Sequence, residues 1–142
     1  MGNSEIDDEL NAAIRASDSP SWSVRAAAGR HLAAYAHLPA ATDVLRRLLL
    51  DGQDTAVTQE TAEALLERRD TCGLRLVLAA FADADHDSSD HLNDAIICSC
   101  LQSDEDRAHL QLLCSHLTSD PDETVRAEAA GLLLELRPRG ER

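Results

Sequence analysis

Aromatic residues and lysine are the scarcest side chains in this chain of 142 residues. It contains one Trp, one Tyr and one Phe, and all 13 of its basic residues are arginines. So few rings leave little material for base stacking, for a carbohydrate platform or for an aromatic cage. Because arginine is always charged and forks onto carboxylates, the cations that are present suit fixed ion pairs.

Acidic residues outnumber basic residues along most of the chain. Aspartate and glutamate number 26 against the 13 arginines, which gives a net charge of −13 and a pI near 4.6. A protein with this charge is repelled by phosphate, so nucleic acid and anionic membranes are disfavoured as partners. We therefore expect the partner to be another protein, and a basic one.

Long apolar stretches, an export signal and paired cysteine motifs are also missing. No apolar run approaches the roughly 20 residues that span a bilayer, and residues 1–20 are acidic without an apolar centre. Because no CxxC occurs, we interpret the cysteines as small core residues rather than as a zinc site. The four are Cys72, Cys98, Cys100 and Cys114. These absences predict a cytoplasmic protein.

Sequence motifs for catalysis are absent as well. The chain has no GxSxG, HExxH, GxGxxG or GxxxxGK[ST], and its 6 glycines leave no place for a phosphate-cradling loop. The histidines have no partnered nucleophile in view. His116 lies in a segment similar to two others, in which Leu48 and Phe81 take its place, and this match predicts a partly buried core histidine. We expect no enzyme activity, no cofactor and no metal.

The residues that the chain does contain favour helix. Hydrophobic residues make up 44% of the sequence, and most of them are alanine and leucine, which are good helix formers. β-Branched residues are sparse, and no run alternates with a period of two. The composition and length predict one all-α domain.

Two segments 101 residues apart are closely similar. SPSWSVRAAAGRHL (19–32) and DPDETVRAEAAGLL (120–133) share a Val-Arg-Ala core, an alanine two positions later and a closing leucine. Each begins with a candidate N-cap, Ser19 or Asp120, followed by a proline at what we expect to be the first helical position. The two segments are therefore interpreted as copies of one repeat.

Two weaker copies lie between them. The anchor residues Val24, Val57, Leu92 and Val125 are spaced 33, 35 and 33 residues apart. After each of the first three anchors comes a second segment with apolar residues at i, i+1, i+4 and i+5, which is typical of a helix buried on one side. The pattern predicts eight helices, over residues 5–17, 23–36, 41–51, 56–69, 72–83, 89–102, 104–118 and 121–136.

The segment DPDETVRAEAAGLL resembles the HEAT-repeat family in its short, PBS-lyase-type form. The likeness rests on the Asp-Pro turn, the Val-Arg pair and the small residues Ala127, Ala129 and Ala130, whereas Thr58 and Asn93 replace the arginine in the middle copies. The resemblance implies a right-handed α-solenoid of about three and a half to four stacked helical hairpins. It also implies that the second helices line a concave, protein-binding side. It is nearly silent on activity, because the family hosts many unrelated roles.

The repeats also predict how the domain is organised. We expect a single HEAT-like domain over 1–142, with a capping helix in 1–18, repeats over 19–136 and a frayed tail over 137–142. Arg25 and Arg126 fall in the first turns of helices, where the helix dipole disfavours cations. They therefore indicate acceptors in adjacent turns, such as Asp51 or Asp120, and we interpret these pairs as a structural ladder.

The densest polar cluster runs from Asp83 to Asp94. Its carboxylates at places 1, 3, 5 and 12 imitate a calcium loop, but Ser88 stands where the loop needs glycine and Asp94 is shorter than the usual glutamate. We interpret residues 83–91 as a solvated turn with Asp87 as the N-cap of the next helix. Metal binding at this turn is the alternative.

Charge is uneven along the chain and supports a functional hypothesis. Residues 53–87 and 88–120 each carry a net −5, whereas residues 21–52 carry +2. We expect a non-catalytic protein-interaction module whose acidic band binds a basic partner, in its concrete form an immunity or inhibitor protein that neutralises a toxic nuclease. The candidate contact residues are Glu60, Glu63, Glu67, Asp83, Asp87, Asp90 and Asp94.

Other interpretations remain open at this point. The charge could serve solubility alone, and the chain could be a small scaffold or adaptor protein. Similar short repeats occur in bilin lyases and in chaperone-type maturation subunits, for which only Trp22, Tyr35 and Phe81 could help to line a tetrapyrrole cleft. Some HEAT-like domains are DNA glycosylases, but these need a cationic groove and aromatic contacts that this composition withholds.

Overall fold

A computed structural model describes the backbone of residues 2–137 and the side chains of residues 7–137. Within this part of the chain there are eight α-helices, one short 3₁₀-helix and no strand, which confirms the all-α class. Each predicted helix overlaps one observed helix. The elements are α1 (Gly2–Ala16), α2 (Trp22–Leu32), η1 (Ala33–Tyr35), α3 (Pro39–Leu49), α4 (Thr55–Leu66), α5 (Thr71–Ala80), α6 (His86–Cys100), α7 (Asp104–Leu117) and α8 (Glu123–Glu135).

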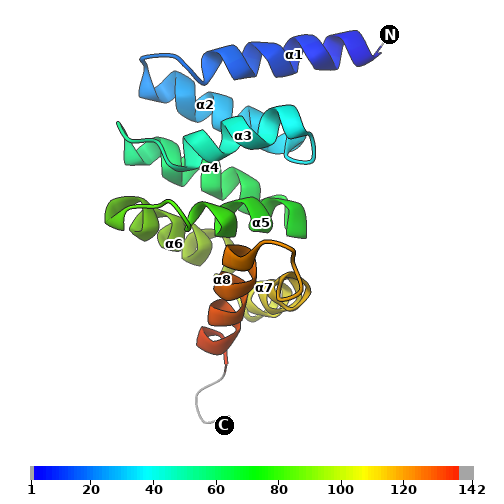
Figure 1. The fold of residues 1–142 in the computed structure, drawn as a ribbon, viewed down its shortest axis with the longest axis vertical. Coiled ribbons are helices and arrows are strands. Elements are labelled where there is room, and N and C mark those ends of the chain that lie inside the picture. The colour runs from blue at the N-terminus through cyan, green and yellow to red at the C-terminus, as the bar shows by residue number, and fades with distance from the viewer. Residues whose placement is uncertain (1, 138–142) are drawn as a thin grey trace.

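The helices pack in two series along the long axis of the molecule. Helix α2 packs on α4 and α4 packs on α6, while in the other series α1 contacts α3, α3 contacts α5 and α5 contacts α7. Figure 1 shows α1 to α6 lying across the long axis, one pair below the other from the N-terminal end. Consecutive helices such as α4 and α5 also contact each other, so each helix from α1 to α7 is packed by members of both series.

Helix α8 departs from this order. It packs mainly against α5 and α7, where a fourth member of the α2–α4–α6 series would pack against α6. In Figure 1 it runs nearly along the long axis, at a steep angle to the helices above it. One consequence is that Ile97 of α6 is left 53% exposed. The even repeat spacing did not indicate this change of direction.

The core is built from leucine, valine and alanine with close helix contacts. Leu32, Leu45, Leu65, Leu78 and Leu92 are essentially inaccessible to solvent. Small residues allow neighbouring helices to approach closely, as they do between α2 and α4. There a Cβ added to Gly29 would collide with Oγ1 of Thr61, so the contact requires glycine.

The prolines do not occupy the first helical positions that we predicted. Helix α2 starts at Trp22 with Ser21 as its N-cap, and α8 starts at Glu123 with Asp122 as its N-cap. The reason lies in the preceding turn. Ser19 Oγ accepts from the Ser21 amide at 3.1 Å, and the equivalent Asp120 Oδ2 accepts from the Asp122 amide at 2.9 Å. Each proline therefore lies inside a closed turn, one residue before the N-cap.

The predicted turn over residues 83–91 is also wrong in extent. Helix α6 begins at His86, because the carboxylate of Asp85 accepts a hydrogen bond from the Ser88 amide at 2.8 Å and so acts as the N-cap. Hydrogen bonding to that amide also lowers the pKa of Asp85. Asp87, which we expected to be the N-cap, lies in the first turn of the helix, where the dipole favours an anion.

None of the described helices combines the length and the apolar character that crossing a membrane requires.

Candidate functional site

Three of the seven predicted contact residues belong to α4 and its C-terminal end. Glu60, Glu63 and Glu67 follow the i, i+3, i+7 spacing that places side chains on one side of a helix. Glu60 forms an ion pair with Arg30 of α2. Glu63 accepts a hydrogen bond from Gln59 Nε2 at 3.2 Å, and Glu67 is exposed as the C-cap of the helix.

Three more predicted residues lie on α6, with the same spacing. Asp87, Asp90 and Asp94 are all exposed. The nearest basic group to Asp90 is the His86 ring, whose Nε2 lies 3.6 Å from the carboxylate. Helices α4 and α6 pack side by side, so the acids of both helices contribute to one surface.

Gln59 joins these two sets of acids, and sequence reasoning did not single it out. Its amide Nε2 donates to Asp94 at 2.6 Å, and its Oε1 lies 2.7 Å from Nδ1 of His91. The repeat alignment could have indicated this contact, because Gln59 follows the anchor Val57 by two positions and Asp94 follows the anchor Leu92 by two positions. We call Glu63, Glu67, Asp87, Asp90 and Asp94 the acidic surface.

Asp83 and Glu60 stand apart from the other predicted contacts because each has an arginine partner. Asp83 follows α5, and its carboxylate pairs with Arg46 of α3, in the other helix series. Glu60 is paired with Arg30, as described above. Sequence charge counts cannot separate such paired acids from free ones, because the partners lie 30 and 37 residues away.

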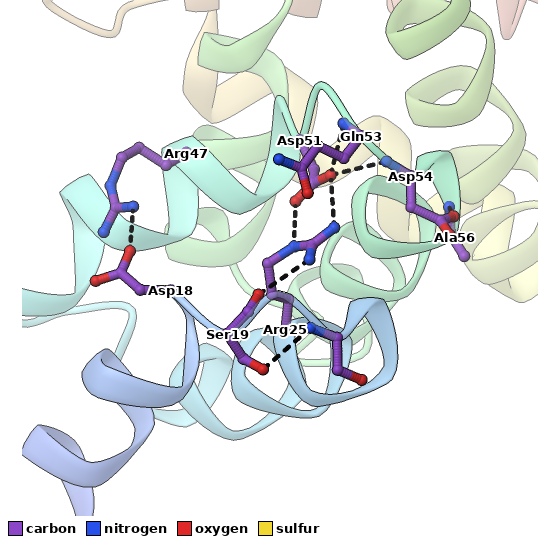
Figure 2. Close-up of polar contacts among 9 residues, drawn as sticks. Asp18, Ser19, Arg25, Arg47, Asp51, Gln53, Asp54 and Ala56 are labelled. Carbon is purple, nitrogen blue, oxygen red and sulfur yellow. Dashed lines mark hydrogen bonds and ion pairs between the residues drawn. The ribbon is translucent and has the colours of Figure 1, made fainter.

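The best-enclosed ion pair lies between turns and matches the predicted ladder. Arg25 Nε donates to Asp51 Oδ2 at 2.8 Å and Nη2 donates to Oδ1 at 3.2 Å, while Nη1 donates to the Ser19 carbonyl at 3.0 Å. Figure 2 shows this network, together with the separate Arg47–Asp18 pair.

The same network controls the ionisation of Asp51. Partial burial alone would raise the pKa of its carboxyl, but the hydrogen bonds from Arg25 and from the amides of Asp54 and Gln53 outweigh that cost. The pKa of Asp51 is therefore held below its ordinary value. The turn that follows α3 is fixed to α2 by a carboxylate that stays ionised.

A second rung occurs at the turn between α7 and α8. Arg75 Nε of α5 donates to Asp120 Oδ1 at 2.8 Å. Arg126 Nη1 donates to the Asp120 carbonyl at 2.8 Å, which repeats the contact of Arg25 with the Ser19 carbonyl 101 residues earlier. Arg126 therefore contacts Asp120, which is one of the two acceptors that we predicted, but it does so at the main-chain carbonyl and not at the carboxylate. These arginines hold turns together.

The histidine and cysteine predictions have mixed outcomes. His116 is exposed, so the expected core position is wrong; Cys114 and Leu117 of the same helix fill the core instead. Cys100 and Cys114 are buried, and burial raises the pKa of each thiol to about 11. Cys98 is exposed on α6, and desolvation followed by the charges of Asp94 and Glu63 raises its pKa.

Metal binding at residues 83–94 finds no support in the geometry. Asp90 and Asp94 lie within α6 rather than on a loop. Within the described part of the chain, no three His, Cys, Asp or Glu side chains are grouped so that they could hold a metal ion.

An apolar groove between α1 and α2 was not predicted. Its volume is about 470 Å³, and its walls are mostly alanine. Val24, one of the repeat anchors, is 41% exposed at this groove, whereas the equivalent Val57 of α4 is fully buried. We call it the α1–α2 groove, and its lining residues are Glu9, Ala12, Ala13, Ala16, Ser23, Val24, Ala27, Ala28 and His31.

The three aromatic rings considered for a tetrapyrrole cleft occupy different places. Trp22 opens α2 and Tyr35 closes η1 at its far end. Phe81 follows α5 and lines a small cavity with residues of α6 and α8, including Ile96 and Leu132. This arrangement does not favour the bilin interpretation.

Comparison of the chain with protein-family models, with curated proteins and with solved structures returned no match. Two surfaces of the molecule itself therefore indicate its function. The acidic surface offers carboxylates to cationic groups, and the α1–α2 groove offers an apolar wall to another side chain or helix. Surfaces of both kinds can bind another molecule.

Proposed function

We propose that this chain is a non-catalytic protein-interaction module that binds a basic protein through the acidic surface of α4 and α6. The observation that carries the proposal is the presence of five carboxylates on two adjacent helices, outside the arginine pairs of the described chain. Glu60 and Asp83 have their own arginines and are left out of the contact set.

The architecture that we propose for the module is a right-handed α-solenoid of HEAT-like hairpins. Two observations support it. The helices α2, α4 and α6 pack in sequence order, and the arginine-to-carbonyl contact recurs after 101 residues. Helix α8 is the irregular element, because it turns onto α5 and α7.

The electrostatics favour a cationic partner. Like charges at this spacing repel one another, and the repulsion is relieved when ammonium or guanidinium groups come between them. The attraction also acts over about one Debye length, ~8 Å at physiological salt, and so raises the association rate. Binding of this kind weakens as salt is added.

Inhibition of a basic, toxic nuclease is the concrete form of this function that we propose, as an immunity protein in the cytoplasm. Size and charge support it, since a small acidic protein can cover a cationic active site that would otherwise bind phosphate. A scaffold or maturation subunit is the alternative, and it would require no particular charge in the partner.

The test is affinity capture from the source cell lysate at low and at raised salt, followed by mass spectrometry. We expect the wild-type chain to retain a basic polypeptide and to release it when salt is raised. A variant with a neutralised acidic surface, Glu63→Gln/Glu67→Gln/Asp90→Asn, should lose that polypeptide. A charge-matched control, Asp43→Asn/Glu105→Gln/Glu135→Gln, should retain it.

Two results would contradict the proposal. One is recovery of no basic polypeptide by the wild-type chain. The other is a bound polypeptide whose retention is indifferent both to salt and to the three substitutions on the acidic surface.

A further inference from the structure

Helices α2 and α8 are copies of one repeat helix, yet one side of this helix is covered in α2 and bare in α8. The side of α2 that packs on α4 is centred on Gly29, which abuts Thr61. Ala26 and Ala33 lie on the same side by their i−3 and i+4 spacing, and both are buried. Their equivalents 101 residues on are all exposed: Ala127, Ala130 and Leu134.

The receiving side of the contact is also present twice, once covered by a helix and once lining the α1–α2 groove, where Val24 is 41% exposed and Ala28 is buried. On α4 it includes Val57 and Thr61, which are fully buried beneath α2. The equivalents on α2, 33 residues earlier, are Val24 and Ala28, and both line the α1–α2 groove. No helix within residues 2–137 lies over α2 in the way that α2 lies over α4.

The bare side of α8 and the α1–α2 groove match each other in side-chain size. In the α2–α4 contact, Gly29 makes room for Thr61. In the corresponding pair of positions, the exposed Ala130 would face Ala28 at the base of the groove, so the methyl group that is gained on one helix is offset by the atoms that are lost from the other. Leu134 replaces the smaller Ala33, and the groove of about 470 Å³ has space for it.

They also match in charge. An ion pair between Arg30 and Glu60 crosses the α2–α4 contact. The equivalent of Arg30 on α8 is Gly131, and the equivalent of Glu60 on α2 is Ala27. Both charges are absent together, so neither member of the Arg30–Glu60 pair would be left without its partner at the equivalent positions of the contact.

We propose that the exposed side of α8 docks into the α1–α2 groove of a second copy of this chain, in the way that α2 docks on α4. Such a contact uses different surfaces on the two copies, so each pair still has one free groove and one free α8. Further copies can therefore add, which generates open chains or rings rather than a closed symmetric dimer. It involves α1, α2 and α8 and none of the residues of the acidic surface, so this inference and the proposed function can fail separately.

The first test is self-association, measured by sedimentation velocity over a range of concentrations. We expect the wild-type chain to form species larger than a dimer as its concentration rises. Ala27→Glu in the groove or Ala130→Glu on α8 should each raise the dissociation constant by at least about 30-fold, because a carboxylate would be desolvated without a partner. Both positions are exposed alanines. Ala108, an exposed alanine on α7, supplies the matched control, and Ala108→Glu should leave association unchanged.

The second test exploits the two different surfaces. An equimolar mixture of Ala27→Glu and Ala130→Glu chains should form a 1:1 complex and nothing larger, since each variant keeps one intact surface. The double variant Ala27→Glu/Gly131→Arg should recover self-association, because it recreates the Arg30–Glu60 pair. A Cβ at Gly131 meets nothing within 4 Å, so the first atom of the new side chain causes no clash within the folded chain.

Three results would overturn the inference. A wild-type chain that stays monomeric at all concentrations removes the second copy as occupant and leaves the groove to another protein. Single variants that still associate show a contact made elsewhere. A mixture of the two blocked variants that stays monomeric shows that the groove and α8 do not meet.

Discussion

Arg25 carries a full charge although only 6% of the residue is exposed to solvent. Such a charge is tolerated when the geometry of its partners is good and its hydrogen bonds are satisfied. Here the guanidinium forks onto Asp51 and also reaches the Ser19 carbonyl. Asp51 in turn accepts from the amides of Gln53 and Asp54, so one arginine connects two turns that are distant in the sequence.

Neutralising Asp51 is predicted to make the fold less stable and to flatten its acid dependence. We expect Asp51→Asn to lower the free energy of unfolding at neutral pH by about 2 kcal/mol, because the charge that Arg25 pairs with is lost. The pKa of Asp51 is lowered by folding. The stabilisation is therefore fully present above the ordinary carboxyl pKa and is lost as the pH falls through the lower, folded value.

Urea unfolding of the wild-type chain and of Asp51→Asn, at neutral and at acidic pH, checks this prediction. The difference between the two should shrink as the pH falls below about 4. Asp18→Asn serves as the control, since its pair with Arg47 is exposed on both sides and should contribute less than about 0.5 kcal/mol. Equal effects of the two substitutions would contradict the structural role of Asp51.

At the scale of the helix, the contact between α2 and α4 depends on a missing side chain. Gly29 lies against Thr61, whose hydroxyl is buried without a hydrogen-bond partner in the described structure. Glycine in a helix interior costs about 0.5–1 kcal/mol relative to alanine, and an unpaired buried hydroxyl adds a further cost. The close approach of the two axes offsets both by burying the apolar side chains around them.

Gly29→Ala is predicted to be destabilising, and a second substitution should relieve it. The added methyl would collide with Thr61, which we expect to cost about 1–3 kcal/mol in the free energy of unfolding. Combining it with Thr61→Ala should recover much of that loss, giving a coupling energy that a double-mutant cycle measures by thermal or urea unfolding. Gly131→Ala, in open space on α8, should be neutral or stabilising. Additive effects of the two substitutions would show that the residues are not in contact.

The elements also show which parts of the structure the sequence could reveal. Helical periodicity located every helix, because an apolar stripe and its caps are local signals. The start of α6 was missed because Asp85, rather than Asp87, captures an amide, and polar runs such as this one contain several possible caps. The direction of α8 was missed because its packing on α5 and α7 is set by long-range contacts.

The candidate site was likewise predictable from the sequence only in part. The uneven charge along the sequence pointed to Glu60, Glu63 and Glu67, and all three belong to α4 or its C-terminal end. Which acids are free could not be read from spacing, since Arg30 and Arg46 reach their partners across helices. The α1–α2 groove was hidden for a related reason, as Val24 has the same sequence signature as the buried Val57.

On the scale of the whole molecule, a net charge of −13 opposes the compact state by self-repulsion. Part of that repulsion is removed by arginine pairs such as Arg30–Glu60 and Arg46–Asp83. The carboxylates of the acidic surface have no arginine partner within the described chain, and their mutual repulsion retains a cost to stability. A site for a cationic partner requires carboxylates of this kind. Their cost to the stability of the folded chain can be measured without the partner.

Neutralising the acidic surface is therefore predicted to stabilise the isolated chain, and most strongly at low salt. We expect Glu63→Gln/Glu67→Gln/Asp90→Asn to raise the free energy of unfolding by on the order of 1 kcal/mol at low ionic strength, because neighbouring carboxylates on α4 and α6 no longer repel. The gain should fall as added salt shortens the screening length to about 3 Å near 1 M. The dispersed control Asp43→Asn/Glu105→Gln/Glu135→Gln removes the same charge and should gain less. An equal gain from both variants would mean that only net charge matters, and that α4 and α6 hold no concentrated acidic surface for a partner to relieve.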